Sequence, residues 1–161
     1  MPLQLMLASA AITLALVFYT IGVFSERHDE HLSKKHVILF WCGLVFDTTG
    51  TTIMTSMAQA GSAGMTGIHG ITGAAAIVLM LFHAVWATFT LVRRNRNLEQ
   101  TFHRFSTVVW LVWLVPYIIG MFVGIPFIAL SDGATVGISV GIVAVIALVL
   151  AWSSKRKASA A

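Results

Sequence analysis

Two histidines within one long apolar stretch are the residues of this sequence best suited to bind a ligand or a proton. The stretch runs from Gly67 to Val92 and contains His69 and His83, fourteen residues apart. In a helix that separation is roughly 21 Å along the axis, and fourteen steps of ~100° return to nearly the same face. Small residues surround His69, so another helix or a flat cofactor could approach closely. The pattern predicts two imidazoles on one stripe of one helix.

An aspartate in the preceding apolar stretch is the second candidate for chemistry. Asp47 lies ~11 residues inside that stretch, and His83 lies ~10 residues before the basic end of its own, so both are predicted at roughly 15 Å depth. A charged group there costs at least ~2.5 kcal/mol unless it is paired or protonated. We therefore expect Asp47 and His83 to meet, directly or through water or a threonine. Hydroxyl side chains near Asp47 complete this candidate proton or polar site: Thr48, Thr51 and Thr52.

The composition places these residues in a membrane protein. Of 161 residues, 58% are hydrophobic and 10% charged, and the mean hydropathy is +0.89. Five apolar stretches can each cross ~30 Å of hydrocarbon as a helix, and nothing remains for a soluble domain. The sequence predicts an all-α integral membrane bundle, one transmembrane domain over residues 1–161. Its five helices are expected at about 3–24, 37–58, 67–92, 106–130 and 133–152.

The basic residues predict the topology. All ten follow the first, third or fifth stretch, so five crossings would bring them to one side. The positive-inside rule then predicts an external N-terminus and a cytoplasmic C-terminus. The pI near 9.7 follows from this topology and from contact with anionic lipid, and it is poor evidence for nucleic acid. The clusters are Arg27, Lys34 and Lys35; Arg93, Arg94, Arg96 and Arg104; and Lys155, Arg156 and Lys157.

Glycines four residues apart predict close packing of the last two helices. The fourth stretch contains Gly120 and Gly124, and the fifth contains Gly133, Gly137 and Gly141. Such spacing lets two helix backbones approach closely in a membrane. We expect these stripes to form the contact between the two helices. The fifth stretch otherwise lacks polar chemistry, which favours a scaffold role.

Aromatic and polar residues mark the predicted helix ends. Tyr19, Trp110 and Trp113 are expected at the membrane interface, where amphipathic rings are common. Residues 25–36 contain both charge signs and an H-x-x-H pair, His28 and His31. That spacing is a loose zinc pattern without a supporting cysteine. We interpret these residues as a solvated loop.

Four strings of the sequence carry a family resemblance. They are LALVFYTIGV at 14–23, FWCGLVFDTTGTT at 40–52, HGITGAAAIVLMLFHAVWAT at 69–88 and FHRFSTVVWLVWLVP at 102–116. Over roughly residues 10–125 the chain resembles the HsmA-type small bacterial membrane proteins, a family linked by its name to haem sensing. Members of that family have four helices, so the fifth helix here departs from the pattern. The resemblance implies a multi-pass protein of the bacterial cytoplasmic (inner) membrane with a role in haem association or tolerance, and it carries over His69, His83 and Asp47.

The first of three functional hypotheses is haem binding or sensing. Histidines on helices hold b-type haem in membranes, and His69 and His83 have the spacing for one haem near each leaflet. No other helix offers a matching pair of histidines as second ligands. Met54 and Met57 approach the predicted level of His69, so a His/Met or five-coordinate site would complete the coordination.

Two further hypotheses need no cofactor. Asp47 and His83 could exchange protons in a proton-coupled small-molecule transporter or efflux helper, which in a thin five-helix monomer implies a homo-oligomer or a larger membrane complex. Alternatively, the same pair fixes helix register in a non-catalytic structural or regulatory subunit.

The sequence has no P-loop, no G-x-S-x-G motif and no Cys/His metal framework, so no feature supports a soluble-type enzyme.

Overall fold

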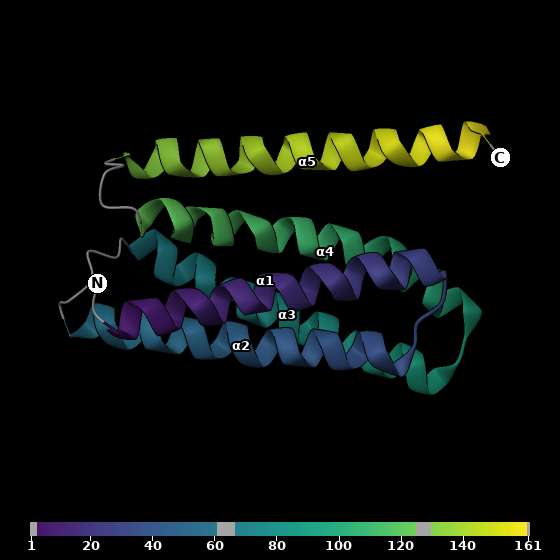
Figure 1. The fold of residues 1–161 in the computed structure, drawn as a ribbon, viewed down its shortest axis with the longest axis horizontal. Coiled ribbons are helices and arrows are strands. Elements are labelled where there is room, and N and C mark those ends of the chain that lie inside the picture. Colours follow the sequence, from purple (N-terminus) through teal and green to yellow (C-terminus); the bar gives the residue numbers. More distant parts are fainter. Residues whose placement is uncertain (1–2, 61–66, 125–129, 161) are drawn as a thin grey trace.

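The protein folds into five helices, as the hydropathy of its sequence predicts (Figure 1). The computed structural model describes residues 3–60, 67–124 and 130–160, and of residues 67–69 and 157–160 it describes only the backbone. Each helix is long and apolar enough to cross a membrane, which gives the chain the architecture of a multi-pass membrane protein. The helices are α1 (Leu3–Asp29), α2 (Lys34–Gln59), α3 (Gly67–Arg93), α4 (Arg96–Val123) and α5 (Asp132–Ala160).

Several helices extend beyond the apolar stretches that predict them. α1 ends at Asp29 rather than near residue 24, and α4 begins at Arg96 rather than near residue 106. Asn95 caps α4, because its side chain accepts a hydrogen bond from the backbone N–H of Asn97 at 2.9 Å. Polar residues with good helix propensity continue the backbone hydrogen bonds, so hydropathy alone underestimates helix length. At its other end α4 stops earlier than predicted, at Val123, and residues 125–129 lie outside the described part of the chain.

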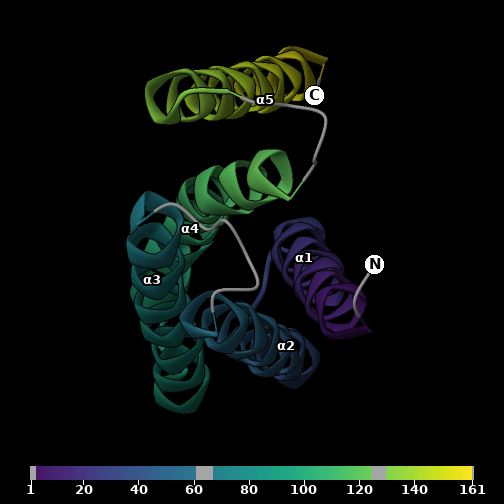
Figure 2. The same ribbon diagram turned by 90° about the vertical axis from the view of Figure 1, so that its left-hand side faces the viewer.

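Helices α1 to α4 form the core of the bundle, and α5 lies at its edge (Figure 2). The α1–α2 pair has the most extensive interface, and α5 packs mainly against α4. Large side chains from all four core helices fill the centre. The fully buried ones include Tyr19, Phe40, Met80, Phe102 and Trp113.

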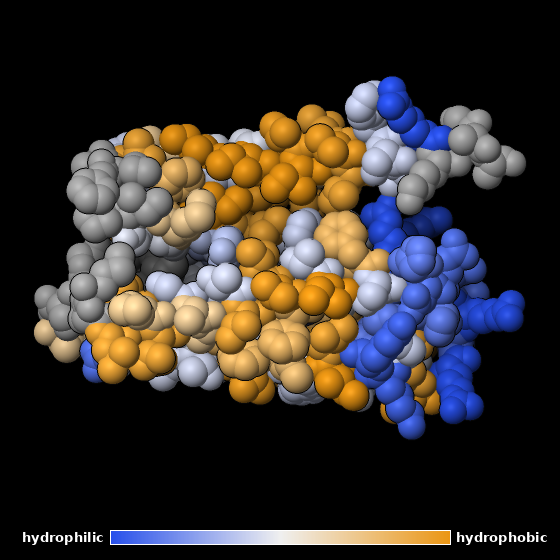
Figure 3. Space-filling model, viewed as in Figure 1, coloured by the Kyte–Doolittle hydropathy of each residue, from blue (hydrophilic) through white to orange (hydrophobic). Residues whose placement is uncertain are grey.

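Charged side chains gather at one end of the bundle, which we call the polar end (Figure 3). It contains the α1–α2 turn, the α3–α4 turn and the last turns of α5. The three basic clusters therefore share one end, as the sequence predicts, while the side of the membrane to which this end belongs stays a prediction. An apolar belt covers the rest of the visible face (Figure 3). Exposed apolar side chains of the helices, such as Val45, Val78 and Leu148, suit contact with lipid.

The expected glycine contact between the last two helices is wrong. Nothing lies within 4 Å of a Cβ atom built on Gly133, Gly137 or Gly141. The buried residues of α5 are instead Thr135, Ser139 and Val143. At ~100° per residue these two sets lie on nearly opposite faces of the helix. Side-chain packing, with hydroxyl groups bonded to their own helix, therefore takes the place of close backbone approach.

Candidate functional site

The buried carboxylate of Asp47 joins three helices of the core. Asp47 lies on α2, and only 4% of its surface is exposed. Its Oδ2 atom accepts a hydrogen bond from the indole N–H of Trp113 on α4 at 2.8 Å and another from the hydroxyl of Tyr19 on α1 at 3.5 Å. The two rings also meet edge to face, with centroids 5.0 Å apart. Donors from two helices thus compensate a carboxyl group that is largely removed from solvent.

The side chains of Tyr19, Trp110 and Trp113, which the sequence predicts at the membrane interface, are buried inside the bundle. Their exposed fractions are 0%, 7% and 2%. Tyrosine and tryptophan are common both at membrane interfaces and in buried positions where a hydrogen-bond acceptor lies beside the ring. The position of these residues in the sequence did not distinguish the two environments. The signal in the sequence was Asp47 itself, because a buried acid needs donors from facing helices.

A glycine on α2 allows the Tyr19 ring to lie against Asp47. A Cβ atom at Gly43 would overlap that ring. We expect Gly43→Ala to lower the free energy of unfolding by about 1–3 kcal/mol through overpacking, measured by unfolding in mixed detergent micelles. Gly137→Ala on α5 is the control, since its Cβ would contact nothing within 4 Å. Equal losses in the two variants would contradict this account.

His83 occupies an aromatic compartment of its own. It is fully buried, its ring stacks on Phe102 with centroids 5.1 Å apart, and the Phe40 ring covers it at 4.5 Å. Its Nε2 atom lies 3.1 Å from the hydroxyl oxygen of Ser106 on α4. Its Nδ1 atom is buried without a hydrogen-bond partner among the described residues.

Asp47 and His83 do not form the predicted direct contact. No hydrogen bond or ion pair joins them among the described residues, and each has other partners. Seven residues, about 10.5 Å of helix, separate the two levels on each helix. At the level of His83 lie Phe40 on α2 and Ser106 on α4. At the level of Asp47 lie Ala76 on α3 and Trp113 on α4.

The physical reason is the unequal overhang of the helices at the polar end. Phe40 lies six residues after the start of α2, whereas His83, at the same level, lies ten residues before the end of α3. α3 therefore extends about 6 Å further than α2. The assumption that both helices end at one level placed His83 too deep.

Only one of the three predicted threonines lies at the Asp47 site. Thr51 lines a small pocket of about 30 Å³ together with Asp47, Gly73 and Ala76. Thr48 and Thr52 are exposed and line a shallow groove on the outer face of α2. At ~100° per residue, Thr51 is turned by ~40° from Asp47 but Thr48 and Thr52 by ~100° and ~140°. The prediction is therefore wrong for these two residues.

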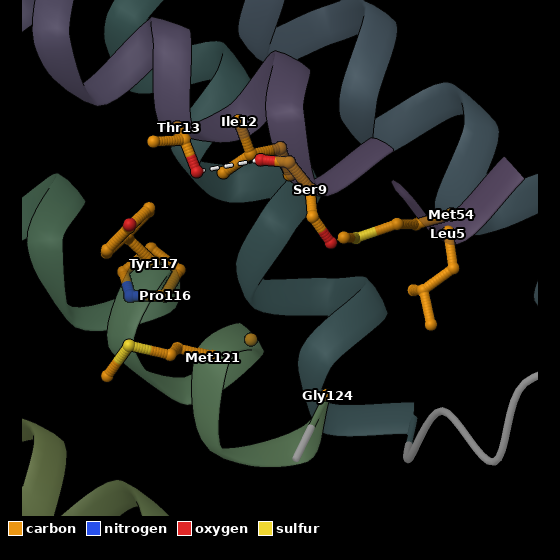
Figure 4. A pocket seen from close by; sticks show the side chains of 10 residues that line it. Leu5, Ser9, Ile12, Thr13, Met54, Pro116, Tyr117, Met121 and Gly124 are labelled. Carbon is orange, nitrogen blue, oxygen red and sulfur yellow. Dashed lines mark hydrogen bonds between the residues drawn. The ribbon is translucent and has the colours of Figure 1, made fainter. Parts of the chain in front are cut away.

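An apolar cavity of about 250 Å³ lies next to the Asp47 pocket (Figure 4). Side chains of α1, α2 and α4 line it, including Met54 on α2 and Tyr117 on α4. Polar atoms in it come from Ser9, Thr13 and Tyr117, and the Thr13 hydroxyl is bonded to the Ser9 carbonyl at 2.8 Å. The cavity and the small pocket share four residues: Ile12, Met54, Pro116 and Tyr117.

His83, one of the residues predicted to hold haem, has no room for haem in this arrangement. The Nε2 atom of His83 faces Ser106 and aromatic rings cover the imidazole, so an iron porphyrin does not fit beside it. The side chain of His69 lies outside the described part of the chain. Met54 lines the cavity and Met57 is 4% exposed. No cluster of three His, Cys, Asp or Glu side chains that could hold a metal ion is found among the described residues.

A second buried acid lies at the polar end. Glu26, expected in a solvated loop, belongs to α1 and is 1% exposed. Its Oε1 atom accepts a hydrogen bond from the Nδ1 atom of His103 on α4 at 3.0 Å, and its Oε2 atom has no hydrogen-bond partner among the described residues. His36, in the same segment, is also buried. The solvated-loop interpretation is wrong for both, because helix packing continues past the apolar residues.

The arrangement can bind a small amphipathic molecule beside a protonatable group. Asp47 supplies the acid, the adjacent cavity supplies the apolar surface, and Tyr19 and Trp113 fix the carboxylate. No family model, curated protein or solved structure matches this chain.

Proposed function

We propose that this protein is a proton-coupled membrane transporter that binds small lipophilic cations, with Asp47 as the group that binds the cation and exchanges the proton. The observation that supports this function most directly is the position of Asp47 at the pocket next to the apolar cavity. An apolar site with one convergent charged group suits a molecule that has an apolar body and a positive group.

The chemistry follows from the cost of an unpaired charge in a membrane. A carboxyl group at the depth of Asp47 is stable when it is protonated or when a cation lies beside it. Entry of an organic cation therefore replaces the proton, and departure of the cation allows the proton to return. Such one-for-one exchange couples the two movements.

The cavity sets the size of the molecule. About 250 Å³ lies below the ~300–1,000 Å³ typical of sites for drug-sized ligands, so the proposed substrates are small. The Tyr117 ring lines both spaces and can attract a cation through its π face. A small aromatic or aliphatic ammonium compound fits these requirements.

The location proposed for this activity is a bacterial cytoplasmic membrane. The positive-inside rule assigns the polar end to the cytoplasm, so the cavity belongs to the outer half of the bundle. A homo-oligomer or a larger membrane complex would enclose the path of the substrate, since five helices make a thin monomer.

The haem hypothesis and the resemblance to the HsmA-type family stay predictions, and of the two histidines proposed to hold haem only His69 stays a candidate ligand. A second candidate is a non-catalytic subunit in which Asp47 serves as a polar clamp. Its hydrogen bonds to α1 and α4 favour that role, and a clamp needs no ligand. Ligand binding therefore separates the two functions.

The test uses phenyltrimethylammonium as a cationic probe and benzyl alcohol as a neutral aromatic molecule of similar size. A ligand at 100 times its dissociation constant stabilises the folded state by about 2.7 kcal/mol. We expect thermal unfolding of the purified full-length chain to shift upward with the cation and not with the alcohol. Asp47→Asn should abolish this shift, because the amide keeps an acceptor for Trp113 but has no charge.

The matched control is Asp132→Asn. Asp132 is an exposed acid in the first turn of α5 and lines neither the cavity nor the small pocket, so this variant should keep the full shift. A chain whose stability is the same with and without the cation, or whose response survives Asp47→Asn, would refute the proposed function and leave the clamp.

A further inference from the structure

One face of α4 contacts three buried ionisable groups, each from a different helix. His103, Ser106 and Trp113 occupy positions three and seven residues apart, which lie on one face of a helix. Between the first and the last of them the helix rises about 15 Å. The partners are Glu26 of α1 at 3.0 Å from His103, His83 of α3 at 3.1 Å from Ser106, and Asp47 of α2 at 2.8 Å from Trp113.

The group nearest the polar end has direct access to water. His103 is exposed over 33% of its side chain and lines two open polar clefts of about 640 and 550 Å³. Glu26 lies behind it, almost fully buried, and its Oε2 atom has no hydrogen-bond partner among the described residues. The charged groups that influence Glu26 are His103 and Glu99 of α4 and Arg27 of its own helix. This pair can exchange a proton with the clefts through the imidazole.

The middle group is His83, which also has a buried ring nitrogen without a partner among the described residues. Among the described residues no charged side chain acts on it, and its ring meets Ser106, Phe40 and Phe102. A neutral imidazole can take a proton on one nitrogen and release one from the other. Its level on the helices lies between that of Glu26 and that of Asp47.

An apolar layer separates His83 from Asp47. The buried apolar residues between these two levels include Leu44 on α2, Met80 on α3 and Val109 on α4, with exposed fractions of 7%, 1% and 2%. His83 lines neither the small pocket at Asp47 nor the apolar cavity next to it. The route to Asp47 from the polar end is therefore closed in this conformation, while the cavity lies on the other side of Asp47.

We propose that Glu26, His103 and His83 form the polar-end proton route of Asp47, and that Leu44, Met80 and Val109 close it. This inference rests on the proposed function. When a cation binds, the carboxylic acid of Asp47 loses its proton and becomes the carboxylate that pairs with the cation. Opening of the apolar layer lets His83 accept this proton, which then passes to Glu26, to His103 and finally to water in the clefts. A closed layer prevents protons from leaking without substrate, as coupled exchange requires.

The experiment measures proton release from the purified full-length chain by stopped-flow with a pH-indicator dye in weak buffer. Phenyltrimethylammonium is the probe, because it carries no ionisable proton and every released proton comes from the protein. The bound cation occupies the cavity, so the proton must leave toward the polar end. We expect Glu26→Gln to slow proton release by at least about tenfold, which corresponds to an increase of about 1.36 kcal/mol in the activation free energy. The equilibrium affinity for the probe should stay unchanged.

His103→Gln is the second variant, because it changes the water-exposed member of the pair and keeps a hydrogen-bond donor for Glu26. Glu30→Gln is the matched control, since Glu30 is an exposed acid at the cleft rim outside the route. Release at the unmodified rate in both Glu26→Gln and His103→Gln, with the probe still bound, would overturn the route but leave the proposed function. Absence of probe binding to the unmodified chain would overturn both.

Discussion

Replacement of Trp113 by alanine is expected to lower the free energy of unfolding by about 3–5 kcal/mol, because a buried hydrogen bond is lost together with the packing of the ring. Three contacts are lost together: the hydrogen bond to Asp47 at 2.8 Å, the edge contact with Tyr19 and the stacked contact with Tyr117 at 5.5 Å. The residual cavity opens beside a carboxyl group, whose acceptor atom then has one donor fewer. Unfolding in mixed detergent micelles measures the change.

Trp152→Ala is the control for this prediction. Trp152 lies on α5 with 59% of its surface exposed, so its loss should change the free energy of unfolding by no more than about 0.5 kcal/mol. Trp113→Phe isolates the hydrogen bond, because the phenyl ring keeps most of the packing, and it should cost about 1–3 kcal/mol. Similar values for Trp113→Ala and Trp152→Ala would show that Trp113 is not in the core.

Phe40→Ala has the second largest expected effect, a loss of about 2–4 kcal/mol. Phe40 is fully buried between α1, α3 and α4, where it contacts Gly22, His83 and Phe102. Large-to-small substitutions in soluble cores cost about 3–5 kcal/mol for phenylalanine. In a membrane the separated helices remain in an apolar solvent, so lost packing contributes most of the cost and the expected value is lower.

The matched control is Phe82→Ala on α3. Phe82 is 48% exposed, and its ring meets those of Trp86 and Phe105. We expect it to cost less than about 1 kcal/mol. A Phe40→Ala variant as stable as Phe82→Ala would contradict the proposed aromatic compartment around His83.

The candidate site was only partly predictable from the sequence. The depth of Asp47 predicts burial and a need for partners, and both hold. The sequence did not predict which residues are its partners, because tyrosine and tryptophan are common at membrane interfaces and Tyr19 and Trp113 were assigned there. Glu26 was missed since its segment, rich in charge, has the composition of a loop, although α1 continues through it.

The sequence by itself determined the number of helices, the gathering of basic residues at one end and the presence of an acid inside the apolar part of α2. These properties follow from composition and from the length of apolar stretches, which act along a single chain segment. The tertiary structure alone decided that Asp47 lies level with Trp113 and Ala76 while His83 lies level with Phe40 and Ser106. The helical repeat fixes which face of one helix a residue occupies, but side-chain packing and the unequal overhang of α2 and α3 fix how far one helix slides along another.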